Sequence, residues 1–187
     1  MRQRKKGSKA RKKPLPIEVT KEEFTEIVKH PKQMKYRIAF LLAWGSGLRI
    51  SEVVNLKQAD FDFNEKTIRI NMGKNSKDRI VPIPKGFQKI HLKYLPMDVG
   101  ARSLQKEFIK CAELAGVKAK KPKVHFHSWR HGFATECIRS GMELSYVQKL
   151  LGHEDLQTTS IYINLAPKEA IEQYRERFLV RWSLPNG

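Results

Sequence analysis

The spacing of hydrophobic residues changes along this chain and separates two helical parts from a short β part between them. In the helical parts, apolar side chains recur every three or four residues, which is the spacing of one buried helix face. Thr20 to Glu23 forms a capping-box pattern that marks the start of the first helix. Helices are expected from Thr20, between Pro31 and Gly45, and at about 51–56, 85–93, 102–115, 127–140, 143–151, 155–163 and 167–181.

A different pattern occupies residues 67–71 and 79–83, where β-branched residues predominate. The polar stretch from Gly73 to Asp78 between them has the composition of a turn, so the two segments predict an antiparallel hairpin. Gly141 and Gly152 stand where glycines commonly end helices. We therefore predict a mainly α fold with a small antiparallel β-sheet, of the α+β class, in one domain over residues 15–187.

The charge of the chain points to its partner. The 187 residues include 37 Lys and Arg against 19 Asp and Glu, a net charge of +18, which is typical of proteins that bind nucleic acid. The longest apolar run, 38–44, is far shorter than the roughly 18 residues of a membrane helix. The basic N-terminus lacks the apolar stretch of a secretory signal, and the two cysteines show no paired spacing. We expect a cytoplasmic protein that binds double-stranded DNA and no membrane.

Two clusters carry much of the basic charge. Residues 1–13 hold eight Lys and Arg and no acidic residue, so we predict a disordered arm over residues 1–14. This arm either lies on a DNA backbone or is a solubilising tail or localisation signal. A second cluster precedes residue 127. The residues expected to contact DNA are Arg2, Arg4, Lys5, Lys6, Lys9, Arg11, Lys12 and Lys13 in the arm, Lys118, Lys120, Lys121 and Lys123 in the second cluster, and Lys77 and Arg79 beside the hairpin turn.

Four motifs follow one another along the chain: GSGLRISEVVNL at 45–56, GKNSKDRIVPIP at 73–84, HSWRHGFAT at 127–135 and LLGHEDLQTTSIY at 150–162. Taken singly, their charged residues have ordinary explanations, such as a surface arginine or a solvated turn lysine. His127 and His131 have the spacing of a zinc helix, but the glutamate of H-E-x-x-H is absent, so we predict no metal site. Together and in this order, the motifs closely resemble the catalytic domain of the tyrosine recombinase family (phage integrases and Xer-like proteins) over nearly all of residues 15–180.

The resemblance implies a catalytic set, because the functional positions of the family fall on matching residues here. These are the two arginines Arg49 and Arg130, the hairpin lysine Lys74, the histidines His127 and His153, the nucleophile Tyr162 and the supporting acid Glu52. Two arginines can hold a phosphate bidentately without a metal. Tyrosine has a free pKa of about 10, so it needs a proton acceptor, for which we expect His127, while Lys74 protonates the leaving 5′ oxygen. The resulting 3′-phosphotyrosyl link allows strands to be rejoined without ATP or any cofactor.

The chain departs from the family in one respect. A helical core-binding domain usually precedes the catalytic domain, whereas here only the basic arm precedes residue 14. We expect either an excised catalytic domain or a naturally minimal recombinase. The helix at 167–181 is expected to pack either on its own domain or, as often in this family, on a neighbouring subunit. The resemblance implies a homo-oligomer, which is a tetramer on synapsed DNA sites, whereas the protein can be a monomer without DNA. Two other functions stay open: a type IB topoisomerase or telomere-resolving relative, and a non-catalytic DNA-binding protein.

Overall fold

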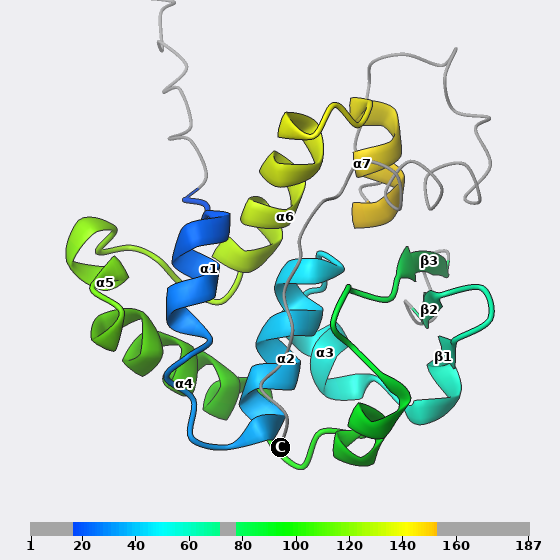
Figure 1. Cartoon of the computed structure of the whole chain (residues 1–187), viewed down its shortest axis with the longest axis horizontal. Coiled ribbons are helices and arrows are strands. Elements are labelled where there is room, and N and C mark those ends of the chain that lie inside the picture. Colours follow the sequence, from blue (N-terminus) through cyan, green and yellow to red (C-terminus); the bar gives the residue numbers. More distant parts are fainter. Residues whose placement is uncertain (1–16, 72–77, 153–187) are drawn as a thin grey trace, which may run out of the picture.

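The computed structural model describes residues 17–71 and 78–152, and its described elements are mostly helical (Figure 1). The α-helices are α1 (Lys21–Ile27), α2 (Met34–Gly45), α3 (Ile50–Asn55), α4 (Ala101–Leu114), α5 (Val117–Lys120), α6 (Ser128–Arg139) and α7 (Leu144–Leu151). The 3-10 helices are η1 (Gln58–Asp60) and η2 (Lys89–Tyr94), and the strands are β1 (Phe61–Asp62), β2 (Thr67–Ile70) and β3 (Arg79–Pro82). The predicted fold class, mainly α with a small antiparallel sheet, is confirmed.

Helix α2 is the centre of the core. Its residues from Ile38 to Gly45 are all buried, because this stretch is apolar on every face and other elements surround it. In Figure 1, α1 and α4 lie on one side of α2, and α3 and the sheet lie on the other. Aromatic rings fill the space around it: Trp44 stacks on Phe24 with 4.5 Å between ring centroids, and Phe40 meets Phe108 edge to face. The core thus fixes the end of α2, where the charged residues discussed below begin.

The sheet is an antiparallel meander in the order β1-β2-β3. Ile68 pairs with Val81 and Ile70 with Arg79 in the ladder between β2 and β3. Side chains alternate across a strand, and here Ile68, Ile70, Val81 and Arg79 all point to the buried face. An arginine therefore stands in the buried row of β3, next to residues that form the core.

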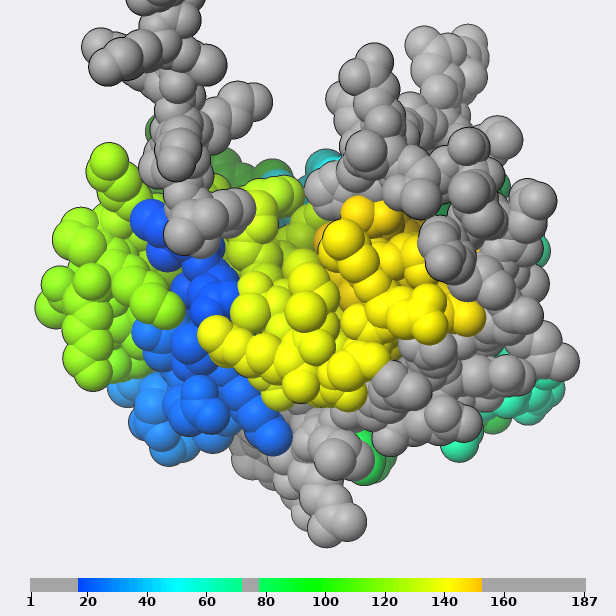
Figure 2. Space-filling model, turned by 90° about the horizontal axis from the view of Figure 1, so that it is seen from above, coloured from blue at the N-terminus to red at the C-terminus, as the bar shows by residue number. Residues whose placement is uncertain are grey.

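The chain before α1 is fastened to α6. The Val19 amide donates to the carbonyl of Ser128 over 3.1 Å, and the Trp44 indole donates to the carbonyl of Val19 over 3.3 Å. A Cβ atom on Gly132 would lie 2.1 Å from that same Val19 oxygen, so the crossing requires glycine. Figure 2 shows the start of the described chain, in blue, lying against α6 and the turn after it, in yellow.

Three local expectations differ from the structure or gain detail. The stretch predicted as a helix at 85–93 is a 3-10 helix that begins only at Lys89, because Gly86 has a φ of 97°, which no right-handed helix contains. The two-residue strand β1 and the four-residue helix α5 are too short to leave a periodic signal. Gly141 and Gly152 have φ values of 83° and 63°, which confirms their predicted places after helices.

The predicted helices at 155–163 and 167–181 and the arm lie outside the described residues. No helix of the described part is long and apolar enough to cross a membrane.

Candidate active site

The turn after α2 places Arg49 at the start of α3. Gly47 adopts a φ of 65°, and a Cβ on Gly45 would lie 2.5 Å from Cβ of Pro84, so both glycines are needed for this close turn. Arg49 is the N-cap residue of α3, and its backbone N–H donates to Oε2 of Glu52 over 2.7 Å. Its guanidinium donates through Nη1 to Oε1 of the same carboxylate over 2.8 Å. Glu52 thus holds both the backbone and the head group of Arg49.

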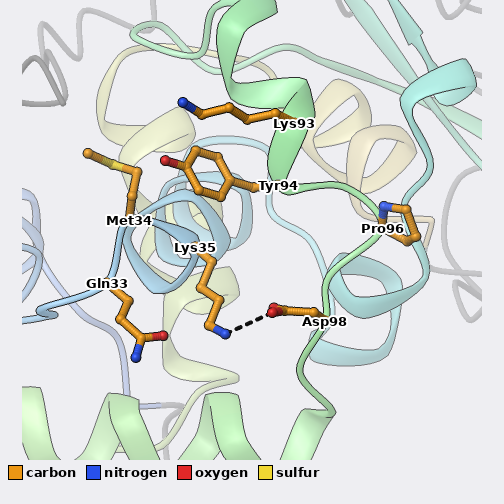
Figure 3. Close-up of a pocket in the computed structure, with 7 residues that line it drawn as sticks. All are labelled: Gln33, Met34, Lys35, Lys93, Tyr94, Pro96 and Asp98. Atoms are coloured by element: carbon orange, nitrogen blue, oxygen red, sulfur yellow. Dashed lines mark hydrogen bonds and ion pairs between the residues drawn. The ribbon is translucent and has the colours of Figure 1, made fainter.

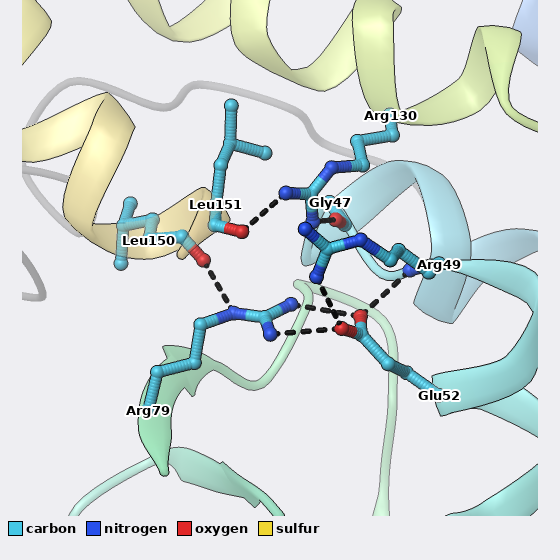
Figure 4. A network of polar contacts seen from close by, with 7 residues as sticks. All are labelled: Gly47, Arg49, Glu52, Arg79, Arg130, Leu150 and Leu151. Carbon is cyan, nitrogen blue, oxygen red and sulfur yellow. Dashed lines mark hydrogen bonds and ion pairs between the residues drawn. The ribbon is translucent and has the colours of Figure 1, made fainter. Parts of the chain in front are cut away.

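Arg79 approaches the same carboxylate from the sheet (Figure 4). Its Nη1 and Nη2 donate to the two oxygens of Glu52 over 2.8 and 2.7 Å, which is a bidentate pair, and its Nε donates to the carbonyl of Leu150 over 2.9 Å. Arg79 is only 8% exposed. We expected this residue to contact DNA, but the structure commits its head group to Glu52 and α7 instead. The head group of Arg79 is thus bonded within the protein, and the DNA contact expected for it stays an untested prediction.

Arg130 reaches the site from α6. Its Nη1 donates to the carbonyl of Gly47 over 2.7 Å, and its Nη2 donates to the carbonyl of Leu151 at the end of α7. The side chain is almost fully buried. Burial and, after it, the charges of Arg49 and Arg79 lower the pKa of Arg130 to about 9, so the guanidinium stays positively charged at neutral pH. Two backbone carbonyls therefore hold a charged head group in one orientation.

Glu52 is the carboxylate on which two of these arginines meet. Burial by itself would raise its pKa, but the hydrogen bonds and charge of Arg79, followed by the hydrogen bonds of Arg49, outweigh burial and lower the pKa to about 2. The network drawn in Figure 4 contains three guanidinium groups and this one carboxylate. Its net charge is positive, and such a site favours an anion.

His127 stands beside these arginines as the N-cap residue of α6. Its ring lies edge-on to His131, with centroids 4.8 Å apart, and 6.2 Å from the ring of His125. Although His127 lies at the surface, partial desolvation and the positive potential of His131, Arg130, His125 and Arg49 lower its pKa to about 4. The imidazole is therefore neutral at physiological pH, the form that can accept a proton.

The structure brings together four of the residues that the sequence singled out for catalysis: Arg49, Glu52, His127 and Arg130. Lys74, Lys77, His153 and Tyr162, and the eight basic residues of the arm, lie outside the described residues. In the second basic cluster, Lys120 and Lys123 are exposed. Lys121 instead donates to Glu23 over 2.6 Å and to the carbonyl of Glu18 over 2.9 Å, so it fastens the chain before α1.

Sequence reasoning missed the inward direction of Arg79. The signal was present, because the period of two in a strand places residues 79 and 81 on one face, and Val81 is an evident core residue. The sequence also gave no sign that the backbone carbonyls of Gly47, Leu150 and Leu151 accept hydrogen bonds from the arginines, because a pattern of side chains does not reveal which carbonyls are used.

A separate pocket of about 470 Å³ lies between the start of α2 and η2 and contains none of these residues (Figure 3). Its rim carries an ion pair between Lys35 Nζ and Asp98 Oδ2 at 2.9 Å. Since the arginine network lies at the other end of α2, this pocket is not part of the candidate site.

Comparison with known proteins decides the family. A family model described as the phage integrase family matches residues 17–99 and 96–169. The chain belongs to this family. A tyrosine recombinase of Thermosipho africanus is 33% identical over 175 residues, which cover 87% of this chain and 62% of that protein. This chain thus spans about three fifths of the length of that relative.

Solved structures agree with this assignment. The integrase from mycobacterium phage Brujita superimposes with a TM-score of 0.66 and 23% identity, over 89% of this chain and 61% of that one, which shows the shared fold. The XerH site-specific recombinase bound to its difH substrate, in a pre-cleavage complex, has a TM-score of 0.61 and 25% identity over 83% of this chain and 52% of that one. The family and the catalytic-domain fold expected from the motifs are confirmed.

Proposed function

We propose that this chain supplies the catalytic part of a site-specific DNA recombinase or integrase, which cleaves and rejoins DNA strands through Tyr162. The observation that supports it best is the convergence of Arg49, Arg130 and His127 on one positively charged site. Arg49 and Arg130 lie 81 residues apart in the sequence, so only the fold brings them together. A phosphodiester is the anion that such a pair of guanidiniums suits, because each offers a planar fork of donors.

The two arginines differ in how they are presented. The side chain of Arg49 is 33% exposed, and Glu52 orients it from one side, so part of its fork is open to an incoming phosphate. Arg130 is held by two carbonyls, which take one N–H each of the five that a guanidinium carries. In the proposed reaction both stabilise the negative charge that gathers on the non-bridging oxygens in the transition state.

The proposed first step attaches the protein to DNA. The Tyr162 oxygen attacks the phosphorus and its proton passes to His127, whose imidazole is neutral at physiological pH because partial desolvation and, after it, the surrounding positive charges lower its pKa. The bond from phosphorus to the 5′ oxygen breaks, and Lys74 gives that oxygen a proton. His153 is assigned a hydrogen bond to the phosphate. The products are a 3′-phosphotyrosyl link and a 5′ hydroxyl, and attack by a second 5′ hydroxyl reverses the step and rejoins a strand.

The proposed partner is double-stranded DNA. Strand exchange between two duplexes requires several copies of the protein, for which we propose a homo-tetramer.

A covalent-capture experiment with DNA of random sequence tests this function. The substrate is a duplex with a randomised core and a nick just beyond it. After cleavage the short fragment that carries the 5′ hydroxyl dissociates, so the strand cannot be rejoined and the covalent protein–DNA complex accumulates. The complex is isolated under denaturing conditions and its DNA is sequenced. We expect the wild type and the matched control Tyr36→Phe to form the complex, and Tyr162→Phe to form none. If the wild type forms no more complex than Tyr162→Phe, the proposed function is wrong.

A further inference from the structure

We propose that Arg79 is a positioning residue for the strand-transfer site: it fixes Arg49 through Glu52 and, by a separate bond, fixes the end of α7. This inference rests on the proposed function and goes beyond it, because Arg79 would act without touching DNA.

The accessibility of the three side chains that meet at Glu52 supports this division of labour. The side chains of Arg79 and Glu52 are 7% and 8% exposed, whereas that of Arg49 is 33% exposed. Arg49 therefore presents exposed donors to a phosphate, whereas all three guanidinium nitrogens of Arg79 already donate to Glu52 or to the carbonyl of Leu150. Figure 4 shows Arg79 and Arg49 approaching Glu52 from different elements, β3 and the start of α3.

The charge balance at Glu52 gives Arg79 a chemical task. A carboxylate that paired with Arg49 alone would orient it but would also cancel its charge, and so weaken its attraction for phosphate. Arg79 occupies both oxygens of Glu52 bidentately, so the single negative charge is shared between two guanidiniums. Glu52 can then hold Arg49 in place while the pair of arginines keeps a net positive charge.

A second bond links Arg79 to the end of α7. Its Nε donates to the carbonyl of Leu150, and Arg130 donates to the carbonyl of the next residue, Leu151. The last carbonyls of a helix have no partner within the helix, so two arginines from different elements cap α7. Gly152 follows with a φ of 63°, and a Cβ there would lie 2.8 Å from Cδ of Arg79, so the side chain of Arg79 passes where only glycine leaves room. Arg79 thus sets one edge of the segment from which the chain continues toward residue 153.

The test compares two arginines on paired strands. Arg79→Met removes the bonds to Glu52 and Leu150, while Arg69→Met changes an exposed arginine of the neighbouring strand β2, which is the matched control. Single-turnover formation of the covalent complex is measured against DNA concentration, and equilibrium DNA binding is measured against salt. We expect Arg79→Met to lower the maximal rate on the order of a hundredfold, as small misplacements of reacting groups do, with an unchanged half-saturation concentration. Arg69→Met should leave the maximal rate unchanged.

The salt dependence separates positioning from DNA contact. A side chain that pairs with a DNA phosphate contributes about one unit to the slope of log affinity against log salt. We expect Arg79→Met to keep the wild-type slope. A slope lowered by about one unit, with a normal maximal rate, would show that Arg79 contacts DNA and would overturn the proposal.

A second variant and the pKa of Glu52 exclude a merely structural role. Arg79→Lys keeps a positive charge but cannot pair bidentately with Glu52 and also reach Leu150, so we expect a rate between those of the wild type and Arg79→Met. Because Glu52 loses its strongest partner in either variant, its carboxyl pKa, followed by NMR in the protein without DNA, should be higher than in the wild type. An Arg79→Lys protein with the wild-type rate and the wild-type pKa of Glu52 refutes the proposal, even if Arg79→Met does not fold. A wild type that forms no covalent complex contradicts the proposed function instead.

Discussion

Removing the charge of Glu52 should destabilise the fold at neutral pH far more than removing an exposed carboxylate. In Glu52→Gln the side chain keeps its shape, but the buried Arg79 loses its ion pair with Glu52, and Arg49 and Arg130 lose a neighbouring negative charge. Arg79 and Arg49 lower the pKa of Glu52 from 4.5 to about 2 although burial opposes them. One pKa unit corresponds to about 1.4 kcal/mol, so the charged form stabilises the folded protein by about 3 kcal/mol. Breaking a buried pair by removing one partner typically costs about 3–5 kcal/mol, which is the same range.

The pH dependence of this effect follows from the direction of the shift. The pKa of Glu52 is lower in the folded than in the unfolded state, so its stabilisation is complete above pH about 5 and is lost as the pH falls toward 2. We therefore expect the difference in unfolding free energy between wild type and Glu52→Gln to be largest at pH 6–8 and to shrink between pH 5 and 3. Urea denaturation followed by circular dichroism at several pH values measures it.

Glu26→Gln is the control for that experiment. Glu26 pairs with Lys29, but both side chains are more than half exposed, so its loss should cost less than about 1 kcal/mol at any pH. The reasoning fails if Glu52→Gln destabilises the protein no more than Glu26→Gln does. It also fails if the difference from wild type is the same at pH 7 and pH 3.

Two further predictions concern α6. Gly132→Ala should destabilise the protein by about 1–3 kcal/mol in the same denaturation assay, because the new Cβ would lie 2.1 Å from the Val19 oxygen. The control is Gly100→Ala, whose Cβ would meet nothing within 4 Å and which should change stability by less than about 1 kcal/mol. Equal effects of the two substitutions would contradict the close crossing of α6 and the chain at Val19. The ring of His127 should titrate near pH 4 by NMR in the protein without DNA, because desolvation and, after it, the neighbouring positive charges lower its pKa. Its pKa should rise when a phosphodiester binds, because the phosphate offsets the positive potential. A pKa near the ordinary 6.5 without DNA would show that neither desolvation nor the neighbouring charges act on the ring.

Long periodic elements could be predicted from the sequence, and short or glycine-interrupted ones could not. The capping box at Thr20 and Glu23 forms as expected, with hydrogen bonds in both directions. Helix α4 lies within one residue of its predicted bounds, because its apolar stripe is strong and continuous. The prediction at 85–93 was wrong in type because the periodic pattern hides the conformation of Gly86. β1 has two residues and owes its existence to pairing with β2, a tertiary effect that local pattern does not encode.

Which residues meet in the candidate site was predictable where it depends on side-chain identity and motif order. The motifs placed Arg49, Glu52, His127 and Arg130 in one site, and the structure brings these four together. The role of Arg79 required knowing which way β3 faces and which carboxylate lies opposite, so its charge alone suggested DNA. Lys121 presents the same difficulty, since a lysine in a basic cluster can equally well fasten a neighbouring chain segment.

The backbone holds the positive charges of this site as much as the side chains do. Arg130 bonds to carbonyls of the turn after α2 and of the end of α7, and Arg79 bonds to a carbonyl one residue earlier in α7. Carbonyls at the end of a helix lack internal partners and carry the negative end of its dipole, so they suit guanidinium donors. The same bonds therefore end α7 and orient Arg130, which is proposed to bind phosphate, and Arg79, which is proposed to position Arg49. Because they join α2, α6, α7 and β3, the site takes shape only when these four elements have packed. Arg130 therefore cannot be replaced by lysine without loss, since a single ammonium group cannot span two carbonyls in fixed directions.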